Sequence, residues 1–283
     1  MPIKEKDLIV FGYGQMTELM IEAMIKQDKK VLCVTNNTHK QVKRSLIDKM
    51  EIYAVNELTQ LEIISNATIF TWRNSGILQA SNNNLINWIK SSRFATRKSC
   101  LLSSASVYKD SPTPVNESNQ NLEAKVEFNS KYQLEMMLAD LMKVKQSHHI
   151  NLRISNVYGK NLDYGFIGSL LKSIELGTTV VLFEDQSITR DYIHVNDVVQ
   201  AVQKLIQIDV YTGSLNVSSG VGTTISKVLE IFSNNGIEFK NFKIVPMFEN
   251  YKKSSILNCN ALSELIDWKP ISVRSALNDM LAK

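Results

Sequence analysis

Cysteine is scarce in this sequence, and so are long apolar runs. The three cysteines, Cys33, Cys100 and Cys259, are widely spaced and form no CxxC pair. An odd count without close pairs argues against the disulfide framework of a small secreted protein. Cys33 and Cys100 lie in apolar runs, so we interpret both as buried strand residues rather than nucleophiles. No apolar run reaches the roughly 18 residues that suggest a membrane-spanning helix. Residues 1–10 also lack a signal-peptide pattern, so we expect a soluble, cytoplasmic protein without a membrane partner.

The sequence has no long block of acidic or basic residues, and its net charge is small. The 283 residues include 32 Lys and Arg against 28 Asp and Glu, which gives a formal net charge of +4. No long basic block and no basic stripe interleaved with aromatic residues is present, which argues against a nucleic-acid partner. The small excess suits an anionic small ligand, although an ordinary solvated surface explains it more simply. We also expect no bound metal.

Short apolar runs alternate along the chain with segments of helical periodicity. The runs lack an apolar–polar alternation, which is typical of strands buried on both faces of a parallel sheet. They cover residues 8–11, 31–34, 52–55, 67–70, 99–103, 151–154 and 179–182. The helical patterns cover residues 18–25, 130–146 and 166–176. This alternation predicts an α/β fold built on a doubly wound parallel sheet of the Rossmann type.

A glycine-rich turn follows the first apolar run. It consists of Gly12, Tyr13, Gly14, Gln15 and Met16. Gly12 permits a tight turn, Gly14 lets a diphosphate approach the backbone, and the N-terminus of the following helix favours negative charge. The third position of the GxGxxG pattern is Thr17, which implies a slightly displaced helix or a weaker site. A plain strand–helix turn gives the same pattern, but the position after a strand and before an amphipathic helix favours a dinucleotide site.

The end of the second apolar run lacks the acidic residue that usually holds the ribose hydroxyls of NAD. Asn36 and Asn37 stand there instead, and their amides can hydrogen-bond a ribose. Lys40 and Arg44 would suit a 2′-phosphate, and an exposed helix face would carry them equally well. We therefore expect NAD or NADP as the cofactor, with a slight preference for NADP.

The regular alternation of apolar runs and helical segments changes near residue 160, and the segments after this point are shorter and more polar. We expect a dinucleotide-binding Rossmann domain over residues 1–160, which also receives elements from about 188–212. A smaller C-terminal substrate-binding lobe is expected over most of residues 161–283, interleaved with the main domain. The chain contains no low-complexity linker and no internal repeat.

Several segments together resemble the extended short-chain dehydrogenase/reductases, the NAD-dependent epimerase/dehydratase family. They are FGYGQMT at 11–17, LLSSASVYKDSPTPVNE at 101–117, NSKYQLE at 129–135, LRISNVYG at 152–159, RDYIHVNDVVQAV at 190–202 and GSLNVSSG at 213–220. Their order and spacing match the family from residue 8 to about residue 275. The resemblance implies a Rossmann fold, NAD or NADP, and a nucleotide-activated sugar as the substrate.

The same resemblance implies a set of catalytic residues with one departure. In the family, a Tyr hydroxyl moves the proton of a sugar hydroxyl while the nicotinamide moves hydride, and a Lys four residues later holds the cofactor ribose. A Ser or Thr at the end of the fifth strand contacts the sugar oxygen. The serine corresponds to Ser104 and the lysine to Lys131, but the tyrosine position holds Glu127. Burial would raise the pKa of this carboxyl group and Lys131 would lower it. Glu127 is therefore either a catalytic acid/base or a salt-bridge partner of Lys131.

Further residues match family contacts to the substrate and the adenine. Asn156 corresponds to a residue whose amide contacts the substrate diphosphate region, and Arg190 to a guanidinium that clamps the diphosphate. Glu57 and Leu58 follow the third strand, where the family contacts adenine. We also expect Asp197 to cap the helix that follows it.

We therefore expect an NAD(P)-dependent epimerase, reductase or dehydrogenase that acts on a nucleotide-activated sugar, in the synthesis of a surface polysaccharide. The alternative is a catalytically weakened protein of the same fold that binds dinucleotide or nucleotide sugar as a sensor or partner. Thr17 and Glu127 favour this alternative.

Many relatives form homodimers through two helices, which here cover about residues 82–93 and 118–146. Met136, Met137, Leu138 and Leu141 form an apolar stripe on the second of these helices. The stripe is compatible with such a contact or with ordinary core packing.

Overall fold

A computed structural model of the chain describes residues 3–35, 42–71, 83–118, 122, 126–160, 162–183, 185–208, 212–239, 242–246 and 252–282, with the backbone alone at 83, 84 and 126–130. By their internal contacts these residues form two compact units. The first comprises Met1–Ser103, Ala124–Leu152 and Val202–Ser214, and the second comprises Ser104–Glu123, Arg153–Ala201 and Leu215–Lys283. The chain passes between them several times. The domain boundary near residue 160 stays a prediction.

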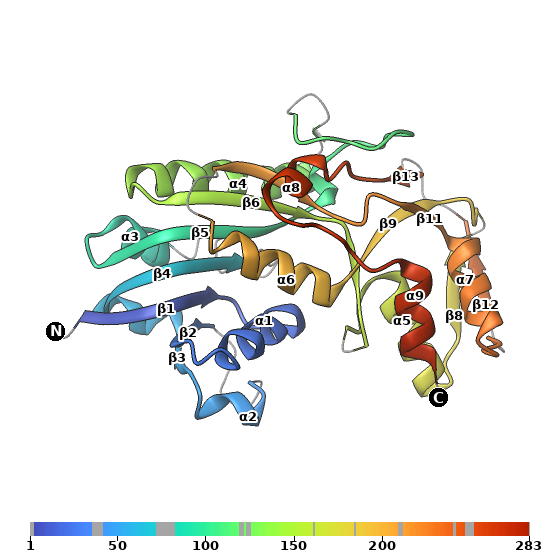
Figure 1. Ribbon diagram of the computed structural model, residues 1–283, viewed down its shortest axis with the longest axis horizontal. Helices are drawn as coiled ribbons and strands as arrows, with labels where there is room; N and C mark the ends of the chain where they lie inside the picture. The colour runs from blue at the N-terminus through green and yellow to red at the C-terminus, as the bar shows by residue number, and fades with distance from the viewer. Residues whose placement is uncertain are drawn as a thin grey trace. The chain divides into compact units, whose positions relative to one another are not determined.

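A seven-stranded sheet forms the centre of the fold, in the order β10-β6-β5-β4-β1-β2-β3. Figure 1 shows β6, β5, β4 and β1 of this sheet side by side. Its strands are β1 (Ile3–Phe11), β2 (Val31–Val34), β3 (Glu51–Tyr53), β4 (Glu62–Thr71), β5 (Phe94–Ser104), β6 (His148–Ile154) and β10 (Gly213–Val217). Strand β1 pairs in parallel with β2 and β4, β2 with β3, and β4 with β5. The chain reverses its direction of progress along the sheet beside β1, which is the doubly wound order. The predicted Rossmann-type sheet is confirmed.

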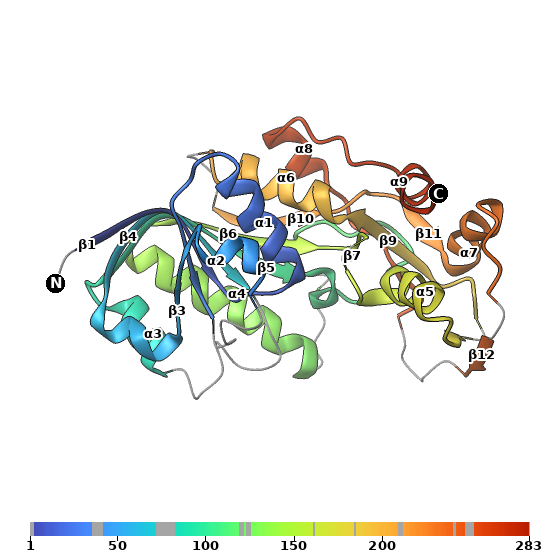
Figure 2. The same cartoon turned by 90° about the horizontal axis from the view of Figure 1, so that it is seen from below.

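Helices of the first unit lie on both faces of the sheet. Helix α1 (Gln15–Ile25) covers one face, and α3 (Asn83–Lys90) and α4 (Val126–Val144) lie on the other (Figure 2). A short helix α2 (Arg44–Ile47) and a 3-10 helix (Val55–Gln60) flank β3. Sheet coverage on both faces explains why the strands are continuously apolar: Val31–Val34, for example, is buried throughout.

The core under α3 and α4 combines apolar side chains from one face of a helix with apolar side chains from the strands. Leu134, Leu138 and Leu141 recur on one face of α4 and pack in the same cluster as Phe11 and Phe70. The rings of Phe11 and Phe70 are stacked, with their centroids 5.0 Å apart. Cys33 and Cys100 are also buried strand residues, as predicted, and burial raises the pKa of both thiols to about 12.

The apolar stripe predicted on α4 belongs largely to this core. Leu138 and Leu141 are buried in the cluster, and Met137 packs against it. Met136 is exposed by 48% and Val144 by 82%. Core packing therefore explains most of the stripe, and the homodimer stays a prediction.

The second unit contains two small sheets and its own core. A four-stranded sheet joins β7 (Asn156–Tyr158), β9 (Thr189–His194), β11 (Gly222–Thr224) and β13 (Ser254–Ser255), and a pair is formed by β8 (Val180–Phe183) and β12 (Phe242–Val245). The helices that follow in the chain are α5 (Gly165–Leu176), α6 (Val195–Leu205), α7 (Ile225–Asn234), α8 (Asn260–Leu265) and α9 (Val273–Leu281). Apolar residues of α5, α7, α9 and β8 form one buried cluster.

The expected helix cap at Asp197 is wrong. Helix α6 begins at Val195, so Asp197 lies in its first turn rather than before it. Its carboxylate instead accepts a hydrogen bond from the backbone N–H of Ile271, at 3.0 Å. A carboxylate in the first helical turn still interacts favourably with the helix dipole.

Two kinds of feature are absent from the described residues: a membrane-spanning helix and a cluster of metal-binding side chains. In the ranges that the structure covers, no helix is long and apolar enough to cross a bilayer. The same ranges contain no group of three or more His, Cys, Asp and Glu side chains arranged to hold a metal ion.

Candidate functional site

The turn between β1 and α1 requires glycine at its first position. Gly12 has a φ of +103°, a conformation that side chains of L-residues rarely adopt. A Cβ atom at this position would lie 2.0 Å from the hydroxyl oxygen of Thr71. That hydroxyl donates a 2.8 Å hydrogen bond to the carbonyl oxygen of Phe11, so it is held in place beside the turn. Glycine therefore lets β1 and β4 approach closely at the start of the turn.

Thr17 takes part in the structure of the same turn. Its side chain is only 4% exposed. Its hydroxyl oxygen accepts a 2.9 Å hydrogen bond from the N–H of Gly14, and its one hydrogen has two acceptors within reach, the carbonyl oxygens of Gly14 at 3.0 Å and Gly12 at 3.2 Å. The threonine that replaces the third glycine of the pattern is thus accommodated by hydrogen bonds that close the turn on itself.

The side-chain hydroxyl of Tyr13 forms two hydrogen bonds within the protein. Its hydroxyl donates to the carboxylate of Glu18 at 2.5 Å and accepts from the backbone N–H of Lys43 at 3.0 Å. Burial raises the pKa of this phenol well above its ordinary value. The ammonium of Lys43 lies 3.7 Å from Glu18, so the negative charge near the start of α1 is partly compensated. Tyr13 fixes the turn to the segment that follows β2.

The start of α1 fits the diphosphate of a dinucleotide. Gly14 is the residue before the helix, in extended conformation and without a side chain that would fill the space in front of the first turn. Gln15 is exposed and Met16 is half-buried in that turn. The N–H groups of a first turn have no acceptor within the helix, and the dipole there favours an anion. Gly12, Tyr13, Gly14, Gln15 and Met16 therefore form one local structure suited to a diphosphate.

The structure bears differently on the residues predicted to contact the ribose and on those predicted to contact the adenine. Asn36 and Asn37 lie outside the described residues. Glu57 accepts a 2.6 Å hydrogen bond from the backbone N–H of Ala54, which closes the first turn of the 3-10 helix. Leu58 is 1% exposed and belongs to the core under α3 and α4, so any contact of Leu58 with adenine would involve its backbone.

Two serines end strand β5 and have different partners. The hydroxyl of Ser103 donates a 2.5 Å hydrogen bond to the carboxylate of Glu135 on α4, and both side chains are buried. Ser104 is half-buried, and its hydroxyl oxygen accepts a 3.2 Å hydrogen bond from the N–H of Ser106. That bond leaves the hydroxyl hydrogen of Ser104 free to donate to another group.

Helix α4 carries the lysine of the predicted catalytic set. Lys131 is half-buried, and this burial lowers the pKa of its ammonium. Glu127 lies one helical turn earlier and Glu135 one turn later, so the three positions share one face of the helix. The side chain of Glu127 is outside the described atoms, so both interpretations of this residue stay open. Sequence reasoning missed Glu135, although a carboxylate four residues after Lys131 on a core-facing stripe is an available signal.

Besides Ser104, the second unit contains two further residues predicted to contact the substrate, Asn156 and Arg190. The side-chain amide of Asn156 donates to the carbonyl oxygen of Asp191 at 3.0 Å. The guanidinium of Arg190 donates to the carbonyl oxygens of Thr189, at 2.8 Å, and of Lys252. These contacts orient both side chains against β9, and their roles toward a substrate stay predictions.

Asp191 is a further buried carboxylate that sequence reasoning missed. It is fully buried and accepts hydrogen bonds from the backbone N–H groups of Ser219, Gly220 and Leu257, at 2.9, 3.0 and 3.3 Å. Burial raises the pKa of this carboxyl group, and the hydrogen bonds oppose the shift. The carboxylate joins three segments of the second unit, next to Arg190 in the sequence.

The segment that follows Ser104 is held by a buried polar network within the second unit. The hydroxyl of Tyr108 donates to the side-chain oxygen of Asn216 at 2.7 Å and accepts from the guanidinium of Arg153 at 3.0 Å. The ammonium of Lys252 donates to the carbonyl oxygens of Ser106, at 3.2 Å, and of Tyr108. Buried and satisfied networks of this kind fix the conformation of the backbone that they contact.

The sheet order and the glycine turn after its first strand are those of a Rossmann-type α/β protein. A family model described as the NAD dependent epimerase/dehydratase family matches residues 8–217. The chain belongs to this family. The predicted family is confirmed.

Individual relatives agree with this assignment. The chain is 30% identical over 190 residues to a dTDP-4-dehydro-6-deoxyglucose reductase of Escherichia coli, a match that covers 64% of this chain and 58% of the relative. The matched part thus spans little more than half of the length of that relative.

Solved structures share the fold over nearly the whole chain. A UDP-N-acetylglucosamine 4-epimerase from Methanobrevibacter ruminantium M1, in complex with UDP-N-acetylmuramic acid, has a TM-score of 0.80 at 20% identity, and the match covers 98% of this chain and 97% of that one. A dTDP-glucose 4,6-dehydratase from Streptomyces venezuelae, solved with NAD, also has a TM-score of 0.80, at 12% identity, over 98% of this chain and 96% of that one. At these identities the likeness supports the fold.

Proposed function

We propose that this protein is an NAD(P)-dependent epimerase, reductase or dehydrogenase that acts on a nucleotide-activated sugar. The observation that carries the proposal is the extent of the family match, residues 8–217, which includes every candidate site residue from Gly12 to Arg190. The reductase from Escherichia coli and the epimerase with its UDP-sugar ligand support a nucleotide sugar as the substrate class.

The proposed cofactor contacts begin with the turn at the start of α1. Gly12 to Met16 would hold the diphosphate through backbone N–H groups, and Asn36 and Asn37 the ribose. Lys131 would hold the nicotinamide ribose, and Glu57 and Leu58 would lie near the adenine. The NAD bound to the dehydratase from Streptomyces venezuelae supports a nicotinamide dinucleotide. The slight preference for NADP rests on Lys40 and on Arg44, which is exposed at the start of α2.

The bound dinucleotide supplies hydride exchange with a carbon of the sugar. Ser104 would donate its hydroxyl hydrogen to the sugar oxygen at that carbon, since its oxygen already accepts from Ser106. Lys131 brings a partly desolvated ammonium, whose lowered pKa makes the loss of its proton less costly than in water. Glu127 would accept or donate the proton of the sugar hydroxyl in place of the family tyrosine. In the substrate half, Asn156 and Arg190 would hold the diphosphate of the sugar.

A second candidate function is binding without turnover. The observation in its favour is Glu127 itself, because an ordinary carboxylate is a poor base toward a sugar hydroxyl, whose pKa lies far above that of a carboxyl group. In this case the chain would hold a dinucleotide or a nucleotide sugar and act as a sensor or partner.

The role of Glu127 can be tested with a matched pair of variants on α4. Glu127→Gln removes the ionisable group with little change of shape, and Asp140→Asn makes the same change at an exposed position of the same helix. If Glu127 moves the proton, turnover falls by about 10²–10⁴ in Glu127→Gln, while Asp140→Asn keeps the wild-type rate. Equal rates in all three proteins, measured by mass spectrometry of the sugar product, would exclude that role.

A role in the synthesis of a surface polysaccharide, a cytoplasmic location and a homodimer also stay predictions.

A further inference from the structure

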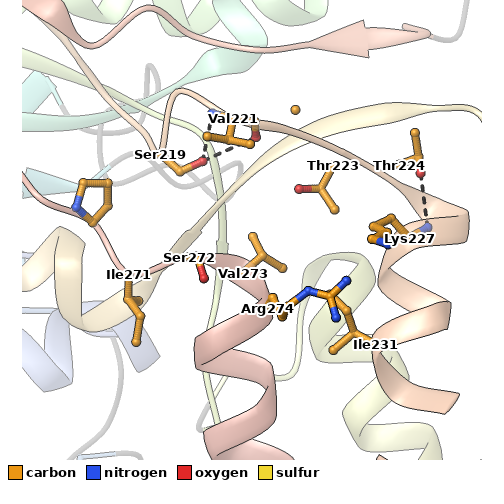
Figure 3. Close-up of a pocket in the computed structure, with 12 residues that line it drawn as sticks. Ser219, Val221, Thr223, Thr224, Lys227, Ile231, Ile271, Ser272, Val273 and Arg274 are labelled. Carbon is orange, nitrogen blue, oxygen red and sulfur yellow. Dashed lines mark hydrogen bonds between the residues drawn. The ribbon is translucent and has the colours of Figure 1, made fainter. Parts of the chain in front are cut away.

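A separate pocket lies in the second unit, where the starts of α7 and α9 approach each other (Figure 3). Its volume is about 500 Å³, which is within the range of small-molecule sites. None of the residues proposed above to contact cofactor or substrate lines it. The pocket is therefore a cavity that the proposed function leaves unexplained.

The walls of the pocket are largely apolar. Val221, Ile231, Ile271 and Val273 contribute side chains from three segments of the chain: the turn before β11, helix α7 and the start of α9. Val221 is 62% exposed and Ile271 is 36% exposed, so both present apolar surface to water at the pocket. An occupant with an apolar part would remove this surface from water.

Two cations at the pocket share a single carboxylate, that of Glu230. The ammonium of Lys227 donates to both carboxylate oxygens of Glu230, at 2.7 and 2.6 Å, and this hydrogen bonding lowers the pKa of Glu230. Arg274 forms an ion pair with the same carboxylate, with its guanidinium nitrogen 3.6 Å from the carboxylate oxygen. The carboxylate of Glu230 is thus shared between two cations, and it engages only part of the guanidinium of Arg274, which carries five N–H donors.

The position of Arg274 directs these donors toward the pocket. Figure 3 shows its guanidinium extending from α9 toward Ile231 of α7, with Val273 beside it. Thr223, on another side of the pocket, has a hydroxyl that makes no hydrogen bond to the residues that the structure describes. A guanidinium fork matches the paired oxygens of a carboxylate or phosphate, and the threonine offers one more donor.

We propose that this pocket binds a small oxyanion, a carboxylate or a phosphate monoester, carried on an apolar group of several carbons. The apolar group lies against Val221, Ile271 and Val273, and the oxyanion accepts hydrogen bonds from Arg274. This site is distinct from the proposed cofactor and substrate contacts, so the two proposals can fail independently.

Four probes separate charge from apolar contact: hexanoate, hexyl phosphate, hexan-1-ol and acetate. Calorimetry on the full chain should show binding of hexanoate or hexyl phosphate, and at least about tenfold weaker binding of hexan-1-ol and acetate, since each lacks one of the two contacts. The first two probes distinguish a carboxylate from a phosphate ligand. Methyl-labelled spectra should show shifts at Ile231, Ile271 and Val273. Shifts confined to other methyl groups, or equal affinity for hexan-1-ol and hexanoate, would overturn the proposal.

Variants of exposed side chains complete the test without disturbing the core. Arg274→Gln should weaken hexanoate or hexyl phosphate binding by about tenfold or more, and Val221→Ser should also weaken it. Lys49→Gln changes an exposed cation of the first unit and should leave the affinity unchanged. Wild-type affinity in Arg274→Gln, with melting temperatures equal in all variants, would contradict the assignment of the oxyanion to Arg274.

Discussion

The hydroxyl of Ser103 and the carboxylate of Glu135 form a 2.5 Å hydrogen bond in the interior of the first unit, where their side chains are 7% and 1% exposed. This bond joins the end of β5 to the middle of α4. Ser103 directly precedes Ser104 in the chain, and Glu135 follows Lys131 by one helical turn. A buried carboxylate must be paired, because its desolvation is otherwise uncompensated.

A double-mutant cycle on this pair should give a coupling free energy of about 1.5–3 kcal/mol, the range for hydrogen bonds to charged groups. Ser103→Ala, Glu135→Gln and the double variant would be compared with the wild type by urea unfolding. Both single variants should be less stable, and the second change should cost less once the first is made. Strictly additive losses would show that the two side chains do not depend on each other.

The turn at Gly12 predicts a strong effect of a single methyl group. Gly12→Ala should lose stability for two reasons: the φ of +103° costs about 1–3 kcal/mol with a side chain, and the new Cβ would meet the hydroxyl of Thr71. Gly236→Ala is a matched control, since Gly236 has a φ of +73° with nothing within 4 Å of the added atom. Unfolding free energies should rank Gly12→Ala below Gly236→Ala. Equal losses of stability in the two variants would show that the close approach of the Thr71 hydroxyl adds nothing to the cost of a side chain at position 12.

Thr17 offers a test of how the turn works without its third glycine. Thr17→Val keeps the shape but removes the hydroxyl that bonds Gly14 and Gly12. Leaving those backbone groups unsatisfied should cost about 1–3 kcal/mol in unfolding free energy. Affinity for NADH and NADPH should fall as well, because the same turn is proposed to hold the diphosphate. Unchanged affinity in a destabilised variant would separate the stability of the turn from cofactor binding.

His149 gives the first unit a defined dependence on pH. Its ring lies 2.8 Å from the hydroxyl of Ser99 and 3.0 Å from the side-chain oxygen of Asn151, and burial lowers its pKa from 6.5 to about 4. The unfolded chain takes up a proton below pH 6.5 and the folded chain only below about pH 4. Stability should therefore fall with decreasing pH in that window, by up to about 1.4 kcal/mol per pH unit.

The pH experiment has a neighbouring control. His149→Gln should flatten the dependence of unfolding free energy on pH between those limits. His148→Gln alters an exposed residue and should leave the wild-type slope. The same slope in wild type and His149→Gln would assign the acid sensitivity to other groups.

Much of the fold could be predicted because the strands are buried on both faces. Leu8–Phe11 and Val31–Val34 stand out as apolar runs, and both lie in the central sheet where expected. The boundaries were less predictable. The apolar run at 52–55 continues past β3, which ends at Tyr53, and Val55 already begins a 3-10 helix. Local composition does not show where pairing with a neighbouring strand stops.

Polar side chains were harder to place than apolar ones. The sequence motif identified Ser104 and Lys131. It did not indicate the hydrogen bond between Ser103 and Glu135, because these two residues are far apart in the sequence. Asp197 looked like a helix cap by its position, but its partner is the backbone of Ile271, which only the folded chain brings near. Such contacts depend on tertiary structure, so local patterns identify the residue but not its partner.

The central claim is that the chain converts a nucleotide sugar with the help of a nicotinamide dinucleotide. The most direct test is incubation of the purified protein with UDP-, dTDP- and GDP-sugars, with and without NAD, NADH, NADP and NADPH, followed by mass spectrometry of the products. We predict conversion of at least one sugar that depends on a dinucleotide and is strongly reduced in Lys131→Met. Binding of a dinucleotide without conversion of any sugar in the panel would contradict the claim and favour a protein that binds without turnover.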